Sequence, residues 1–98
     1  MRKPIKTKPY DAALFLDNEE TIAAYLDEAL ASGELALIVE AIGAVARARG
    51  IGKVAESADL SRESLDRSLG RDGNPEFATI VRVLQALGLR LTVQPVAV

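Results

Sequence analysis

Apolar residues in the front half of the chain recur at helical spacing in two stretches, and each stretch ends at a glycine. The first precedes Gly33 and the second precedes Gly50. This predicts one helix from about residue 17 to 32 and another from 34 to 49. Asp17 and Glu20 have capping-box spacing at the start of the first helix. The two stripes are Ile22, Tyr25, Leu26, Ala29 and Leu30, then Leu35, Ile38, Val39, Ile42, Val45 and Ala46.

Residues 51–69 read as two short helices joined by a tight corner. The second helix should begin after Ser61, whose hydroxyl can accept a hydrogen bond from the amide of Glu63 or Ser64. Asp59 falls at the corner, where positive φ is needed, and Asp tolerates that conformation better than most residues. This pattern predicts a helix-turn-helix, and the alternative is a structural corner in a helical bundle. The apolar contacts of the corner would be Val54, Ala58, Leu60 and Leu65, with the small Ala55 at the crossing.

The sequence from residue 74 onward predicts one more helix and then a strand. Asn74 is suited to cap the helix and Pro75 to be its first residue, and Gly88 should end it. Residues 89–93 then alternate like a half-buried strand, which must pair with the N-terminal segment or with a second subunit. We therefore expect an all-α fold of about five helices with a short C-terminal strand. The apolar face of the last helix would be Phe77, Ile80, Val81, Leu84 and Leu87.

The chain of 98 residues suits one small domain, with residues 1–16 as an N-terminal arm and 17–98 as the helical domain. It contains no cysteine and no histidine, so thiolate chemistry, zinc sites and the commonest general base are missing. We expect neither enzymatic activity nor a cofactor. No apolar run approaches the length of a membrane span or a signal peptide core, which makes the cytoplasm the expected compartment.

Charge is divided unevenly along the chain. Residues 1–10 carry four bases, residues 11–40 carry eight acids and no base, and residues 41–98 carry eight bases and six acids. This division indicates two surfaces for two partners, although acidic helices can also be simply well solvated. The outward face of the helix after Ser61 offers side chains that can reach DNA. Arg can donate hydrogen bonds to guanine, Glu can accept a hydrogen bond from cytosine, and Ser can donate or accept one.

We expect Arg62, Ser64 and Arg67 to read bases, with Glu63 adjusting the choice of base. Phosphate contacts are expected from other positions near the corner. These are Lys53, Ser61 and Arg71, with Asn74 assisting.

In the order and spacing of several short motifs, the chain resembles the HigA-type antitoxins, which are addiction-module antidote proteins with an XRE-like helix-turn-helix. The resemblance implies a lambda-repressor-like fold, a small basic toxin of the RelE/ParE-like class as partner, and repression of the operon by operator binding. The chain departs from the family pattern at Asp66, at Asp59 and at the pair Ile51-Gly52. These departures concern which operator sequence is bound and how tightly, more than DNA binding itself. The motifs are Lys8-Pro9-Tyr10-Asp11, Ala24-Tyr25-Leu26, Ala46-Arg47-Ala48-Arg49-Gly50, Leu60-Ser61-Arg62-Glu63-Ser64-Leu65, Gly73-Asn74-Pro75-Glu76-Phe77-Ala78-Thr79 and Ala86-Leu87-Gly88-Leu89.

The expected toxin site is the acidic surface of residues 17–34, including Asp27 and Glu28, together with the apolar anchors Tyr10, Leu14 and Phe15. The alternative is that Leu14 and Phe15 belong to the core. A homodimer is expected because one recognition helix covers too few base pairs. Its contact would be residues 89–93 or the apolar faces of the N-terminal helices. A stand-alone XRE-type repressor without a toxin and a helical protein-interaction module are the competing functions.

Overall fold

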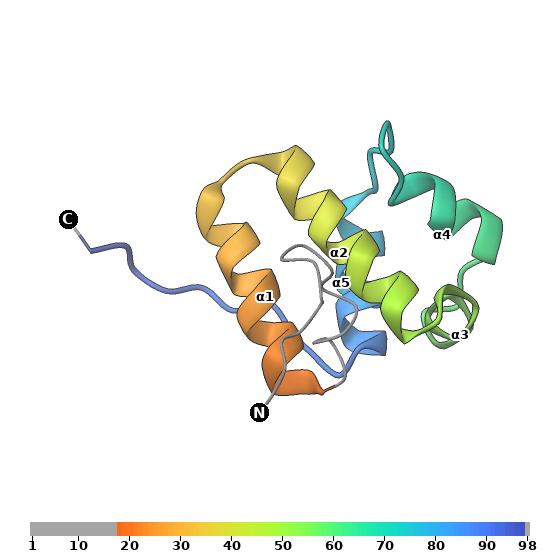
Figure 1. The fold of residues 1–98 in the computed structure, drawn as a ribbon, viewed down its shortest axis with the longest axis horizontal. Helices are drawn as coiled ribbons and strands as arrows, with labels where there is room; N and C mark the ends of the chain where they lie inside the picture. The colour runs from red at the N-terminus through yellow and green to blue at the C-terminus, as the bar shows by residue number, and fades with distance from the viewer. Residues whose placement is uncertain (1–17, 98) are drawn as a thin grey trace, which may run out of the picture.

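The computed structural model describes residues 18–97, and this part of the chain is all-helical (Figure 1). It contains α1 (Glu19–Ser32), α2 (Leu35–Arg49), α3 (Ile51–Ser57), α4 (Arg62–Ser68) and α5 (Phe77–Ala86). Helices α1 and α2 form a hairpin, and α3 packs against α2, α4 and α5. The prediction of five helices is confirmed for residues 18–97.

The first helix is capped one residue later than the sequence predicted. Asn18, rather than Asp17, is the N-cap, and its side-chain oxygen accepts a hydrogen bond of 2.8 Å from the amide of Thr21. Asp17 lies outside the described residues. Gly33 ends the helix at φ 72°, and its amide donates to the carbonyl of Leu30, as the C-cap prediction required.

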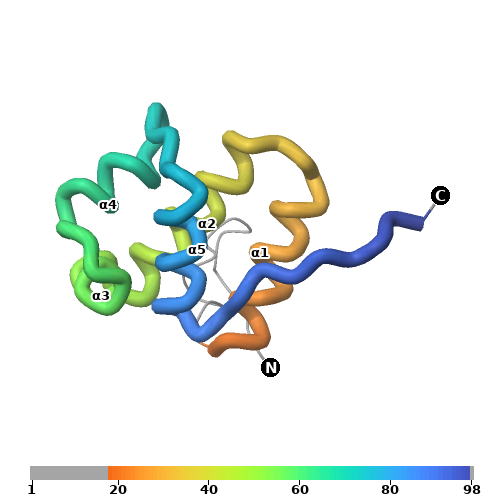
Figure 2. The backbone as a smooth tube through the Cα atoms, turned by 180° about the vertical axis from the view of Figure 1, so that it is seen from behind, coloured from red at the N-terminus to blue at the C-terminus, as the bar shows by residue number. Residues whose placement is uncertain are grey.

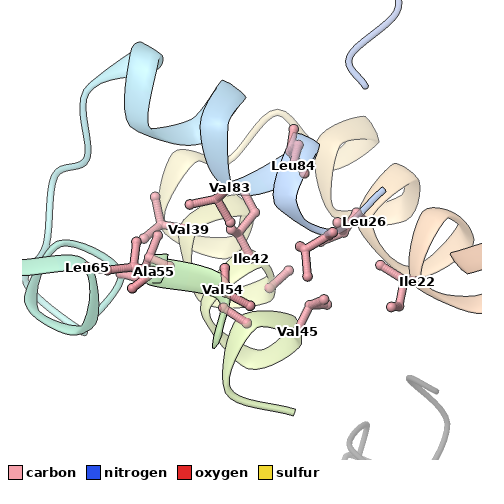
Figure 3. Close-up of a cluster of buried hydrophobic side chains, with 14 residues drawn as sticks. Ile22, Leu26, Val39, Ile42, Val45, Val54, Ala55, Leu65, Val83 and Leu84 are labelled. Atoms are coloured by element: carbon pink, nitrogen blue, oxygen red, sulfur yellow. The ribbon is translucent and has the colours of Figure 1, made fainter. Parts of the chain in front are cut away.

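All five described helices contribute to a single core (Figure 3). The predicted stripes are mostly correct, but Leu30 is 42% exposed, Leu35 is 65% exposed and Phe77 is 72% exposed. Val83 is fully buried although the sequence did not single it out. Leu35 and Phe77 are the first residues of α2 and α5, and Leu30 lies in the last turn of α1. The buried core consists of Ile22, Leu26, Val39, Ala41, Ile42, Val45, Ala46, Val54, Ala55, Ala58, Leu65, Leu69, Val83, Leu84 and Leu87.

The prediction that Asn74 caps the last helix is wrong. The helix begins at Phe77, and its N-cap is Glu76, whose side chain makes no capping bond. Gly73 lies so close to the end of α4 that a β-carbon there would overlap the carbonyl of Ser68. The chain is therefore held along α4 at this point, and it stays extended through Glu76 before it turns into α5.

The prediction of a strand at residues 89–93 is also wrong for the described part of the chain. Gly88 at φ 82° ends the last helix as predicted, and the amide of Leu89 donates to the carbonyl of Leu84. Beyond it, the chain crosses α1 and then projects away from the body (Figure 2). A ladder needs a second strand, and residues 18–97 of one chain supply none.

Candidate functional site

Three local features define the corner between α3 and α4: one backbone conformation and two hydrogen bonds. Asp59 has φ 60°, and among the described residues it is the one residue other than glycine with positive φ. The amide of Leu60 donates to the carbonyl of Ala55 at 2.8 Å. The hydroxyl of Ser61 accepts a 3.0 Å hydrogen bond from the amide of Ser64, so it caps α4. The predicted corner conformation and the predicted cap are both confirmed.

The apolar contacts of this corner are also confirmed. Val54, Ala58 and Leu65 are buried, and Leu60 is half-buried against the core. Ala55 is 1% exposed, which leaves room for no larger side chain where α3 meets α4. The corner therefore packs on the core, and α4 is anchored to it through Leu65 on its buried side.

The opposite side of α4 faces solvent, and all eight residues predicted to contact DNA are exposed. The structure gathers four of them, Ser64, Arg67, Arg71 and Asn74, around one hollow between α4 and the loop that follows it. A second group lies at the α3 side of the corner, where the aliphatic part of Arg62 runs beside Gly52, next to Lys53 in the sequence. Contact with DNA stays a prediction for every one of these residues.

Within the part of the chain that the structure describes, the cations of this surface form no ion pair. Within residues 18–97 the ion pairs join Arg47 to Asp66 and Arg49 to Glu19. The remaining cations around the corner can therefore meet an external anion without breaking a bond inside the described protein. They are Lys53, Arg62, Arg67 and Arg71.

Sequence reasoning missed the partner of Asp66. Arg47, from α2, places its Nε and Nη2 at 3.2 and 3.1 Å from one carboxylate oxygen of Asp66, and its Nη2 lies 3.4 Å from the Asp66 carbonyl oxygen. The two side chains are 44% and 57% exposed. The two residues are 19 positions apart, and no local pattern connects them. Arg49 lies 4.0 Å from Glu19, so both arginines of the α2 C-terminus face carboxylates.

The predicted toxin-binding residues are divided between the described and undescribed parts of the chain. Tyr10, Leu14 and Phe15 lie outside the described residues. Asp27 and Glu28 are exposed on α1, as an acidic docking surface requires.

Around these acids the structure adds apolar side chains that the sequence did not assign to a site. Leu30, Leu35 and Leu37 are 42%, 65% and 46% exposed. A hollow between α1 and α2 is lined by Tyr25 and Leu37 together with Glu28 and Glu40, among others. From residue 18 to residue 46 the chain contains no lysine or arginine. The surface of α1 and the start of α2 is thus acidic with apolar patches.

Two further features of the described residues restrict their chemistry. None of the helices is both long and apolar enough to cross a membrane. In the same residues, no three carboxylates lie close enough together to hold a metal ion.

Comparison with known proteins identifies the family. A family described as "Probable addiction module antidote protein" matches residues 6–95 of the chain. A Haemophilus influenzae protein described as uncharacterized is 44% identical over 87 residues, covering 89% of this chain and 90% of the relative. No solved structure gives a significant match. Because the family match spans nearly the whole chain, the protein belongs to the family of probable addiction module antidote proteins.

Proposed function

We propose that the protein is the antitoxin of a type II toxin-antitoxin module, in which it neutralises a RelE/ParE-like toxin and represses its own operon. In this proposal α3 and α4 form an XRE-like helix-turn-helix of the HigA type, and the protein binds its partners without catalysing a reaction. The observation that carries the proposal is the exposed face of α4. This helix follows a left-handed corner, it is capped by Ser61, and the cations of its exposed face form no ion pair with another described residue.

The exposed face of α4 has the chemistry that DNA recognition requires. Arg67 and Ser64 lie on the outer side of the helix, and Arg71 follows it beside the same hollow. Arginine can bind the guanine edge with two hydrogen bonds, and phosphate contacts from cations such as Lys53 add affinity that falls with salt. The first part of such a helix usually reaches bases, which assigns Arg62 and Ser64 to readout, with Arg67 on the same outer side of the helix.

The acids of α1 lie away from this face. Helices α1 and α4 stand on opposite sides of the body in both views (Figures 1 and 2). Acids such as Asp27 and Glu28 would attract a basic toxin and would be too distant to repel DNA at α4. The exposed Leu30 and Leu37 supply apolar contacts beside these acids, and apolar anchors usually carry most of an interface's affinity.

We propose a homodimer as the DNA-binding form. A two-fold dimer presents two recognition helices to a pseudo-palindromic operator. The extended residues 89–97 are one candidate contact, because Val93 is 97% exposed and Val96 is 83% exposed. Light scattering at micromolar concentration should give twice the monomer mass. A monomer that binds one half-site per chain would contradict this.

The DNA proposal is tested with two single substitutions on duplexes that contain the DNA upstream of the protein's own gene. Arg62→Ala should cost about 1–3 kcal/mol on the preferred sequence and should relax the choice of particular base pairs. Lys53→Ala should weaken all duplexes about equally and flatten the dependence on salt. Identical profiles for the two variants across sequence variants would contradict the assigned roles.

The toxin proposal is tested by co-purification with the product of the neighbouring reading frame. Removal of residues 1–16 should abolish this capture while DNA binding is kept. Reversing the charges of Asp27 and Glu28 should slow toxin association at low salt and have little effect at high salt. If the full-length protein binds DNA but captures no neighbouring product, a stand-alone repressor is the correct function.

A further inference from the structure

The ion pair between Arg47 and Asp66 sits at the edge of the proposed DNA-binding face. Asp66 is an exposed residue of α4, next to Arg67 in the sequence. The guanidinium of Arg47 reaches it from α2 and places two of its N–H groups on the same carboxylate oxygen. Arg47 and Arg71 also line a common hollow, which makes the pair continuous with the cations that follow α4.

A close approach between α2 and Leu69, the residue that caps the end of α4, accompanies this ion pair. At Gly43, one turn before Arg47, an added β-carbon would lie 2.8 Å from Nη1 of Arg47 and 2.8 Å from the carbonyl oxygen of Leu69. The glycine thus lets the end of α4 approach α2 and leaves space for the guanidinium above it. Arg47 also lies 3.4 Å from the carbonyl of Asp66, so it contacts the main chain of α4 as well as the carboxylate.

An unpaired carboxylate at this position would oppose DNA binding. Phosphates repel it, and in a partly exposed setting the repulsion acts across several ångströms. Since the carboxylate of Asp66 accepts both hydrogen bonds from Arg47, its charge is balanced before DNA arrives. We propose that Arg47 is a positioning residue, which neutralises Asp66 and holds α4 ready to approach phosphate without contacting the DNA itself. This inference rests on the proposed DNA-binding function.

The test is a cycle of full-length variants: Arg47→Ala, Asp66→Asn, the double variant Arg47→Ala/Asp66→Asn, and Arg47→Lys as the conservative change. Binding is measured by fluorescence anisotropy against a duplex of about 30 base pairs from upstream of the gene and against a scrambled duplex of equal composition, across a salt series. Circular dichroism of each variant gives the folded fraction, which should stay near that of the natural protein because the pair is solvent-exposed.

The proposal predicts a specific pattern of loss and rescue. Arg47→Ala should weaken binding to both duplexes about three- to tenfold at low salt, with a smaller loss at high salt. The double variant should recover the affinity, Asp66→Asn alone should bind at least as well as the natural protein, and Arg47→Lys should keep most of the affinity.

Three results would overturn it. A double variant as weak as Arg47→Ala would show that Arg47 contacts phosphate directly. If Arg47→Ala binds DNA as well as the natural protein at equal folded fraction, the ion pair is a purely structural contact. If Arg47→Lys binds as weakly as Arg47→Ala, charge neutralisation is ruled out. If the natural protein binds neither duplex, the proposed DNA-binding function fails first, and that outcome is recognised before any variant is compared.

Discussion

Replacing Gly43 by alanine should destabilise the protein, although alanine is the better helix former. Gly43 is buried in the middle of α2, where alanine ordinarily stabilises a helix by about 0.5–1 kcal/mol. Here the new β-carbon would lie 2.8 Å from the carbonyl oxygen of Leu69. That oxygen belongs to the main chain at the end of α4, so it cannot move without displacing the helix.

The expected size follows from these opposing effects. Forcing one extra carbon into a packed core costs roughly 1–3 kcal/mol, which outweighs the gain in helix propensity. We expect the free energy of unfolding of Gly43→Ala to fall by about 1–2 kcal/mol in total. The displacement should also disturb Arg47, whose Nη1 lies 2.8 Å from the same position.

The assay is urea denaturation followed by circular dichroism, with Gly52→Ala as the matched control. At Gly52, in α3, the nearest atom to an added β-carbon is Cδ of Arg62 at 3.8 Å, an ordinary contact. This control should be unchanged or more stable by up to about 1 kcal/mol. The reasoning is refuted if Gly43→Ala is as stable as the natural protein, because α2 and α4 would then not be in close contact.

Further predictions concern the corner between α3 and α4. Asp59→Val should lower the free energy of unfolding by about 1–2 kcal/mol, because a β-branched residue is strained at φ 60°. Asp59→Gly is the control that keeps the backbone conformation. Equal losses of stability in the two variants would contradict backbone strain as the cause. Ser61→Ala should cost about 1 kcal/mol in thermal or urea denaturation through the lost cap. Ser61→Asp should keep the cap but weaken DNA binding through its charge, and an aspartate variant that binds DNA normally would remove Ser61 from the contact surface.

Features that depend on neighbouring residues in the sequence could be predicted. The ends of the first and last helices at Gly33 and Gly88, the left-handed corner at Asp59 and the cap by Ser61 all follow from local backbone chemistry, and each is found in the structure. The exposed positions of α4 were predicted for the same reason, since Leu65 fixes which side of the helix is buried.

Features that depend on how helices meet could not be predicted. The helix α5 starts past Asn74, at Phe77, and the loop before it packs closely at Gly73 against the carbonyl of Ser68, which the pattern of apolar residues does not encode. The pairing of Arg47 with Asp66 joins residues of α2 and α4 that are distant in the sequence, so no local pattern predicts it. The apolar surface at Leu37 also required the structure, because its helix is apolar on several sides and periodicity did not define its exposed edge.

The extended segment at residues 89–97 has a consequence for how steeply repression would respond to the amount of protein. Within the described residues, no amide from Arg90 to Ala97 has a main-chain partner, so this edge can serve as a template for another extended chain. If two copies pair through it, occupancy of a two-fold operator rises with the square of the protein concentration below the dimer dissociation constant. The steepness of repression with protein concentration would then be set by residues 89–97, which are not among the residues proposed to contact DNA.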